Sequence, residues 1–121
     1  MNKSQAIYKF WNSFDIPAYD ENTVPDTAKM PYITFSTATD NIDHPISLTA
    51  SIWQESTSWQ YVEDKAEEIA KFIGYGGYVI KLDNGYLYIT RGTPFAQRVS
   101  DPVETTRRIY INLMAEFLTA I

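Results

Sequence analysis

The only histidine, His44, ends a polar stretch in which Asp40 and Asp43 could join it around a metal ion. Three such residues so close together in one loop are a weak signal, because metal sites usually draw a further ligand from elsewhere in the chain. A serine nucleophile would need the same His44 as its base, and the sequence has no Gly-x-Ser-x-Gly elbow. We therefore expect no metal site, no cofactor and no serine-hydrolase chemistry.

Fifteen acidic residues offer many carboxylate pairs of the kind that hydrolyses glycosidic bonds, but no spacing selects one pair. Glu63, Asp64, Glu67 and Glu68 fall on the polar side of a helical pattern, which is typical of a solvated helix face. Gly74-Tyr75-Gly76-Gly77 follows a helix pattern and precedes a strand pattern, the reverse of a phosphate-binding loop. The sequence favours a protein that is not an enzyme, with a cell-wall hydrolase or sugar-binding module as the alternative from another class.

Aromatic side chains are the most prominent feature of the composition, with nine Tyr, six Phe and three Trp. Tyr and Trp are favoured at protein interfaces because they bury a large area and keep one polar group. Trp53 lies on the polar side of an alternating strand pattern, where either its own chain or a partner must cover the ring. Tyr75, Tyr86 and Tyr88 are the other surface candidates.

Length and charge set the broad class. With 121 residues, 45% of them hydrophobic, the chain predicts one folded domain over residues 1–121. The net charge of -5 argues against a nucleic-acid partner. The lack of an apolar run of about 20 residues, and of an apolar secretory signal, predicts a cytoplasmic protein without membrane contact. Residues 1–64 hold three basic and nine acidic residues, whereas residues 65–121 hold seven and six, so the N-terminal half is acidic.

Two amphipathic patterns predict helices. The first covers residues 4–13, with Ser4 as its N-cap and with Ile7, Phe10, Trp11 and Phe14 on one face. The second covers residues 58–73, from a capping box that begins at Thr57 to a stop at Gly74. Residues 15–30 between the first helix and the first strand have no sustained period and predict an acidic loop.

Alternating patterns predict strands at about residues 32–37, 46–54, 78–83 and 86–91. Asn84-Gly85 suits a two-residue hairpin turn, which would pair Leu82 with Leu87 and Ile80 with Ile89. Gly92-Thr93-Pro94 is expected to break this hairpin, and residues 95–101 to form a short extended or looped segment. Residues 107–116 fit both a strand and a helix. Together these elements predict an α+β fold with a mainly antiparallel sheet of four to five strands, packed by two helices.

Several stretches also resemble a known group of proteins. These are the aromatic N-terminal helix, the acidic Pro-containing loop, Met30-Pro31-Tyr32-Ile33-Thr34-Phe35, Leu48-Thr49-Ala50-Ser51-Ile52-Trp53, Ser56-Thr57-Ser58-Trp59, and the closing Asp101-Pro102 with Arg107-Arg108-Ile109-Tyr110-Ile111-Asn112-Leu113. Together they resemble small minor structural proteins of tailed phages and prophages of Gram-positive bacteria. Within that group the chain is most similar to the tail terminator family, also called tail completion or tail-to-head joining proteins.

The resemblance implies a virion protein that is made in the host cytoplasm and forms a ring, of six copies, at the end of a long non-contractile tail. Such a ring stops polymerisation of the tail tube protein and offers a surface to the head-neck connector protein. The resemblance also favours a strand, rather than a helix, from about Arg107 to Glu116. A head-completion protein, a connector or another minor tail protein is the nearest alternative.

A ring of identical copies needs two different patches on each subunit. We expect Trp53, Phe95 and Arg98 to lie at contacts with other copies or with the tail tube. Phe95 and Arg98 are chosen because the proline-bounded stretch that holds them has little other reason to be both apolar and basic.

Overall fold

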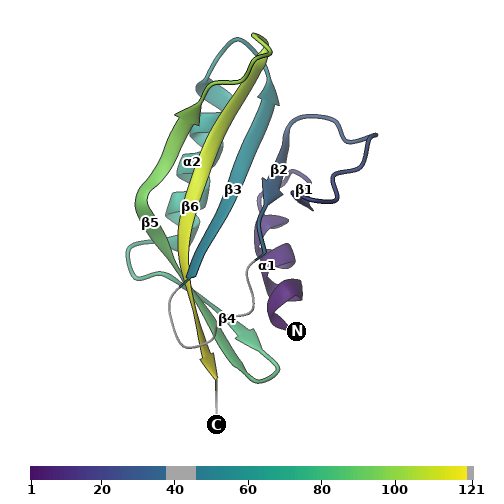
Figure 1. Ribbon diagram of the computed structural model, residues 1–121. Helices are drawn as coiled ribbons and strands as arrows, with labels where there is room; N and C mark the ends of the chain where they lie inside the picture. The colour runs from purple at the N-terminus through teal and green to yellow at the C-terminus, as the bar shows by residue number, and fades with distance from the viewer. Residues whose placement is uncertain (38–45, 120–121) are drawn as a thin grey trace.

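Two helices and one six-stranded sheet make up the computed structural model, which describes residues 1–37 and 46–119 (Figure 1). In chain order the elements are α1 (Lys3–Trp11), β1 (Ala18–Asp20), β2 (Tyr32–Phe35), β3 (Ile46–Glu55), α2 (Gln60–Ile73), β4 (Tyr78–Leu82), β5 (Gly85–Val99) and β6 (Thr106–Thr119). The strand order is β1-β2-β3-β6-β5-β4, and every pair is antiparallel except β1 with β2. The α+β class is confirmed.

The predicted number of four to five strands is wrong because β1 was missed. This strand lies inside the stretch predicted as an acidic loop, and it pairs in parallel with β2, from Ala18 opposite Ile33 to Asp20 opposite Phe35. Three residues are too few to show a period of two, so the strand depends on its partner rather than on its own pattern.

The helices cover one face of the sheet. Along β6 the buried residues Ile109, Ile111, Leu113, Ala115 and Phe117 alternate with side chains that are half-buried or exposed. The buried face packs against α2, which lies behind β3, β6 and β5 in Figure 1. In this view no helix of the described chain lies in front of those three strands, and we call this side the open face.

The two ends of the sheet meet at α1. This helix contacts both β1 and β4, the edge strands, so the sheet curls around the helical layer. Phe10 and Phe14 both pack edge-on against Phe72 of α2. Burial of the predicted aromatic stripe is confirmed, but the predicted N-cap is wrong: Asn2, not Ser4, caps α1, in a reciprocal capping box with Gln5.

The predicted capping box of the second helix does not form. Trp59 occupies the N-cap position of α2 without a capping side chain, and the Gln60 N–H donates to the hydroxyl of Ser58, one residue after the predicted Thr57. The other end agrees with the prediction, because Gly74 stops the helix with a φ of 72°, a conformation that favours glycine.

The β4–β5 hairpin has a different register from the one predicted. Leu82 pairs with Gly85 and Ile80 with Leu87, so Asp83 and Asn84 form the turn. Gly85 is the first residue of β5, so it lies in the strand and not in the turn, and its φ of 148° is one that favours glycine. The shift is two residues on the partner strand, and an even shift leaves every side chain on its predicted face.

Gly92-Thr93-Pro94 does not break β5, contrary to the prediction. The strand continues to Val99, and its pairing with β6 shifts between Arg91 and Ala96. A Cβ on Gly92 would lie 2.6 Å from the Asn112 carbonyl oxygen, so the close approach of the two backbones there requires glycine. Pairing with β4 stops at Ile89, so Pro94 lies in the half of β5 that has β6 alone as a partner, where a missing N–H is tolerated.

The last element is a strand, as the resemblance implied. β6 extends beyond the predicted residues 107–116 and pairs along its length with both β3 and β5. It is therefore a central strand, and this position explains why its inward face is continuously apolar.

Candidate interaction surfaces

Trp53 lies on the open face of the sheet, as its place in the alternating pattern predicted. It stands between Tyr32 of β2 and Arg108 of β6 in the strand register, and its ring is half-buried. The indole Nε1–H donates a hydrogen bond of 2.9 Å to Thr34 Oγ1. This bond fixes the orientation of the ring.

Arg108 stacks against Trp53 and was not predicted. Its Cζ atom lies 4.7 Å from the Trp53 ring centroid and 5.9 Å from that of Tyr110. Its Nε–H donates a 2.9 Å hydrogen bond to the hydroxyl of Ser51, a side chain that is only 3% exposed. The guanidinium is therefore held in place on three sides. We call Thr34, Ser51, Trp53, Arg108 and Tyr110 the Trp53 cluster.

The charge of Arg108 is not neutralised within the described part of the chain. In residues 1–37 and 46–119, no Asp or Glu oxygen lies within ion-pair distance of its guanidinium. The Nε–H is used by Ser51, but the described contacts leave the N–H groups of both Nη atoms without an acceptor. The cluster thus presents a positioned cation with unused donors.

The strand register explains how the cluster forms. Ser51 and Trp53 point to the open face because they alternate with the buried Ala50 and Ile52. The antiparallel pairing with β6 then places Arg108 directly opposite Trp53. Sequence alone could have suggested this pair only if β3 and β6 had been known to be neighbours.

Phe95 and Arg98 lie on the other side of the sheet, in a groove between α2 and the second half of β5. The groove has a volume of about 290 Å³ and is lined by Glu63, Ala66, Glu67, Ala70, Phe95, Ala96, Arg98 and Ile109. Two alanines on α2 leave the space, and the half-buried Phe95 forms part of its wall. We call this set of residues the α2 groove.

Arg98 also stacks on a tryptophan, but its charge is already paired. Its Cζ atom lies 4.7 Å from the Trp59 ring centroid, and its Nε–H donates a 2.7 Å hydrogen bond to Glu63 Oε1. Arg107 approaches the same ring at 5.3 Å, and its Nη2 donates to the Thr57 carbonyl oxygen. The structure thus brings Phe95 and Arg98 together and places Trp53 on the opposite face.

The other aromatic candidates have mixed exposure. Tyr75 is 99% exposed after the end of α2, with the Arg91 guanidinium 4.6 Å from its ring centroid. Tyr86 is exposed on the open face, whereas Tyr88 is half-buried and donates from its hydroxyl to the Gly76 carbonyl oxygen at 2.6 Å. Tyr75 and Tyr86 are therefore accessible, and Tyr88 serves to hold the glycine-rich turn.

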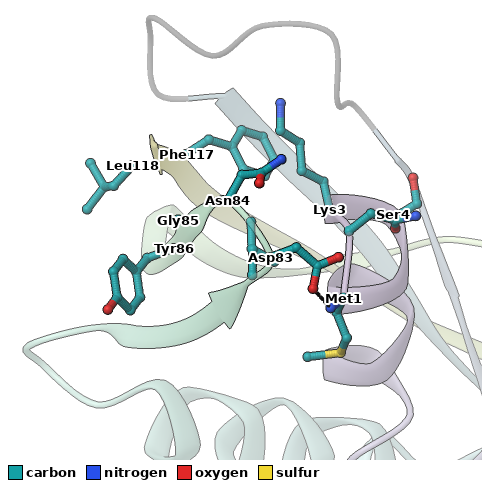
Figure 2. Close-up of a pocket in the computed structure, with 11 residues that line it drawn as sticks. Met1, Lys3, Ser4, Asp83, Asn84, Gly85, Tyr86, Phe117 and Leu118 are labelled. Atoms are coloured by element: carbon teal, nitrogen blue, oxygen red, sulfur yellow. Dashed lines mark hydrogen bonds and ion pairs between the residues drawn. The ribbon is translucent and has the colours of Figure 1, made fainter. Parts of the chain in front are cut away.

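A further pocket of about 290 Å³ lies beside the β4–β5 turn (Figure 2). Among the described residues that line it, Asp83 is the only one with a carboxylate, and the amino nitrogen of Met1 lies 2.6 Å from Asp83 Oδ1. Lys3 Nζ lies 4.4 Å from the ring centroid of Phe117, another lining residue. The described part of the lining thus supplies one carboxylate, whereas glycoside hydrolysis normally uses two.

Comparison with known proteins adds no family assignment. No protein-family model matches this chain, and no curated protein matches it significantly. The similarity to tail terminator proteins therefore depends on the sequence stretches quoted above, and it remains a prediction.

The expectations of no metal site and no membrane contact concern different parts of the chain. Asp40, Asp43 and His44 lie outside them, so the expected absence of a metal there stays a prediction. Within residues 1–37 and 46–119, no three His, Cys, Asp or Glu side chains gather as a metal site. Neither helix in that part of the chain is long and apolar enough to span a bilayer.

Proposed function

We propose that this protein is a tail terminator of a tailed phage or prophage. In this role, copies of the chain form a ring, of six subunits, on the end of the tail tube. The ring stops tube polymerisation and joins the tail to the head through the connector protein. The protein acts by fitting against its own copies and neighbouring virion proteins, within the virion and, during assembly, in the host cytoplasm.

The Trp53 cluster is the observation that carries this proposal. Trp, Tyr and Arg are the residues that contribute most to protein–protein binding energy. Here they are already oriented by Thr34 and Ser51, so less side-chain entropy is lost when a partner binds. A cluster of this composition on an open sheet face suits an assembly contact.

The α2 groove supplies a second surface of different character. A ring of identical subunits uses two different patches on each copy, and a terminator needs a further patch for the tube. The groove and the Trp53 cluster lie on opposite faces of the sheet. We propose that Trp53, Phe95 and Arg98 lie at contacts with neighbouring copies or with the tube.

The test is to mix the purified protein with tail tubes and to image the tube ends by electron microscopy. We expect sixfold rings on the ends, and tubes that no longer elongate when more tube protein is added. Trp53→Ala, Phe95→Ala and Arg98→Ala should each weaken capping, whereas Lys81→Ala, an exposed site on the sheet's open face, should not. If all three alanine variants cap normally, the contact assignment is wrong.

The same experiment separates the alternatives. Twelvefold particles at the capsid portal, with bare tube ends, would identify a connector and overturn the terminator assignment. Cleavage of purified peptidoglycan that is abolished by one carboxylate substitution would instead identify a hydrolase.

A further inference from the structure

The Nη donors of Arg108 are available to an acceptor on another molecule, because no described group of the chain uses them. A guanidinium presents its N–H groups in a planar fork that matches the two oxygens of a carboxylate. Ser51, Trp53 and Tyr110 hold this fork at the open face, and no described carboxylate of the same chain reaches it. The site therefore suits a carboxylate supplied from outside the subunit.

An acidic segment of the same chain offers such carboxylates. The β1–β2 loop, residues 21–31, stands away from the rest of the molecule in Figure 1. The side chains of Glu21 and Asp26 are exposed, and neither has a hydrogen bond or an ion pair with the described residues. Both carboxylates are therefore free to meet a cation on a partner.

The loop has a defined shape despite its exposure. The Glu21 N–H donates to the Phe35 carbonyl oxygen at 2.9 Å, and the Ala28 N–H donates to the Pro25 carbonyl oxygen at 3.0 Å. The first bond ties the loop base to β2, and the second closes a turn near Asp26. A loop held in this way loses less conformational entropy on binding than a flexible one.

The loop and the Trp53 cluster are different patches of one subunit. The loop joins β1 and β2 at one edge of the sheet and ends next to Tyr32, the neighbour of Trp53 in the register, whereas Trp53 and Arg108 themselves lie on β3 and β6. A contact between the loop of one copy and the cluster of the next joins two different sets of residues, as a head-to-tail contact does. Contacts of this type close into a ring when the rotation per subunit allows it.

We infer that the Trp53 cluster of one copy binds the β1–β2 loop of the next copy, with Arg108 donating to a carboxylate of Glu21 or Asp26. This inference rests on the proposed ring function and names the contact that builds the ring. The overall negative charge of the chain makes a phosphate-rich partner a poorer match for one isolated arginine.

Charge reversal on each side of the contact tests the inference. Arg108→Glu and the double variant Glu21→Arg/Asp26→Arg should each weaken the subunit contact at least tenfold, because like charges then face each other. The two variants mixed in equal amounts should form rings again, since each reversed side then meets an opposite charge. Ring formation is measured by native mass spectrometry in solution and by imaging on tail tubes.

Matched controls separate a lost contact from a lost fold. Lys81→Glu makes the same charge change on the same open face, away from the cluster, and should leave the rings intact. The loop variant alters only exposed side chains, so it tests the contact even if Arg108→Glu unfolds. Thermal unfolding followed by circular dichroism checks each variant.

The outcomes distinguish this inference from the proposed function. Rings that persist in Arg108→Glu and in the loop variant, or a mixture that does not recover rings, overturn the inference and leave the terminator function standing. A wild-type protein that forms no ring, alone or on tubes, overturns both.

Discussion

Arg98 and Arg108 stack on tryptophan rings at the same distance but differ in where their charge goes. Each Cζ atom lies 4.7 Å from its ring centroid, that of Trp59 for Arg98 and that of Trp53 for Arg108. Arg98 is paired with Glu63 on its own chain, whereas Arg108 meets only the hydroxyl of Ser51 among polar groups of the described chain. Both arginines stack on a tryptophan, but the charge of Arg98 is paired within the described chain and that of Arg108 is not.

This difference predicts two contacts of different physical character. A partner at the Trp53 cluster gains a charged hydrogen bond, so its binding should depend on salt. A partner in the α2 groove meets Ala66, Ala70 and Phe95 beside an ion pair that is already formed, so apolar burial should dominate there. If the subunits contact each other through the cluster, the groove remains available to the tail tube.

The largest effect on stability is expected at Gly92, where the backbones of β5 and β6 approach each other closely. Gly92→Ala should reduce the free energy of unfolding by about 2–3 kcal/mol, because the new Cβ would meet the Asn112 backbone. Gly76→Ala is the matched control, since nothing lies within 4 Å of a Cβ at that position. Urea unfolding of both variants measures the difference, and equal losses would mean that the strand pair adjusts.

Trp53→Ala should affect assembly more than stability. Removing the half-buried ring and its bond to Thr34 should cost the fold about 1–2 kcal/mol, and should weaken the subunit contact about 30-fold, the effect of a hot-spot residue. Trp59→Ala removes the corresponding ring from the other stack. We expect it to lower stability but to leave the subunit contact, measured by analytical ultracentrifugation, within about twofold. If both variants weakened assembly equally, the proposal that only the Trp53 stack lies at the subunit contact would be wrong.

These two stacks also show what the sequence could predict. The position of Trp53 on the polar side of β3 follows from a strict alternation, and it was confirmed. Its partner Arg108 is 55 residues away and is brought opposite by the β3–β6 pairing, which no local pattern encodes. Residues 107–116 even fitted a helix, so the cluster could not be assembled from the sequence alone.

The missed parts of the fold have the same cause. Gly92 and Pro94 are breakers by local propensity, yet β5 passes through both because β6 supplies pairing on both sides of the register shift. The helices were predicted closely because their apolar stripes, such as Ile7, Phe10 and Trp11, depend on spacing within one segment. Local patterns predicted the helices and the position of Trp53, whereas non-local pairing determined β1, the length of β5 and the candidate surfaces.

Salt should separate the two surfaces further. Raising NaCl from about 0.05 to 0.5 M should weaken the wild-type subunit contact about fivefold, corresponding to roughly 1 kcal/mol of screened ion pairing. Arg108→Gln keeps a polar side chain but has no charge, so the affinity of this variant should be lower and nearly independent of salt. Sedimentation across a salt series measures both slopes, and parallel slopes would show that Arg108 does not carry the charge contact.

The smallest effect is expected from the ion pair between Arg98 and Glu63 in the α2 groove. Arg98 and Glu63 side chains are 56% and 44% exposed, so solvent screens their attraction. A double-mutant cycle of Arg98→Ala and Glu63→Gln should give a coupling free energy below about 1 kcal/mol. Arg98→Ala alone should cost more stability than Glu63→Gln, because its stem and guanidinium also cover Trp59. A coupling free energy above about 2 kcal/mol would mean that Glu63 binds Arg98 as strongly as we propose that a carboxylate of the next copy binds Arg108. The two stacks would then differ only in whether the carboxylate comes from the same chain or from another copy.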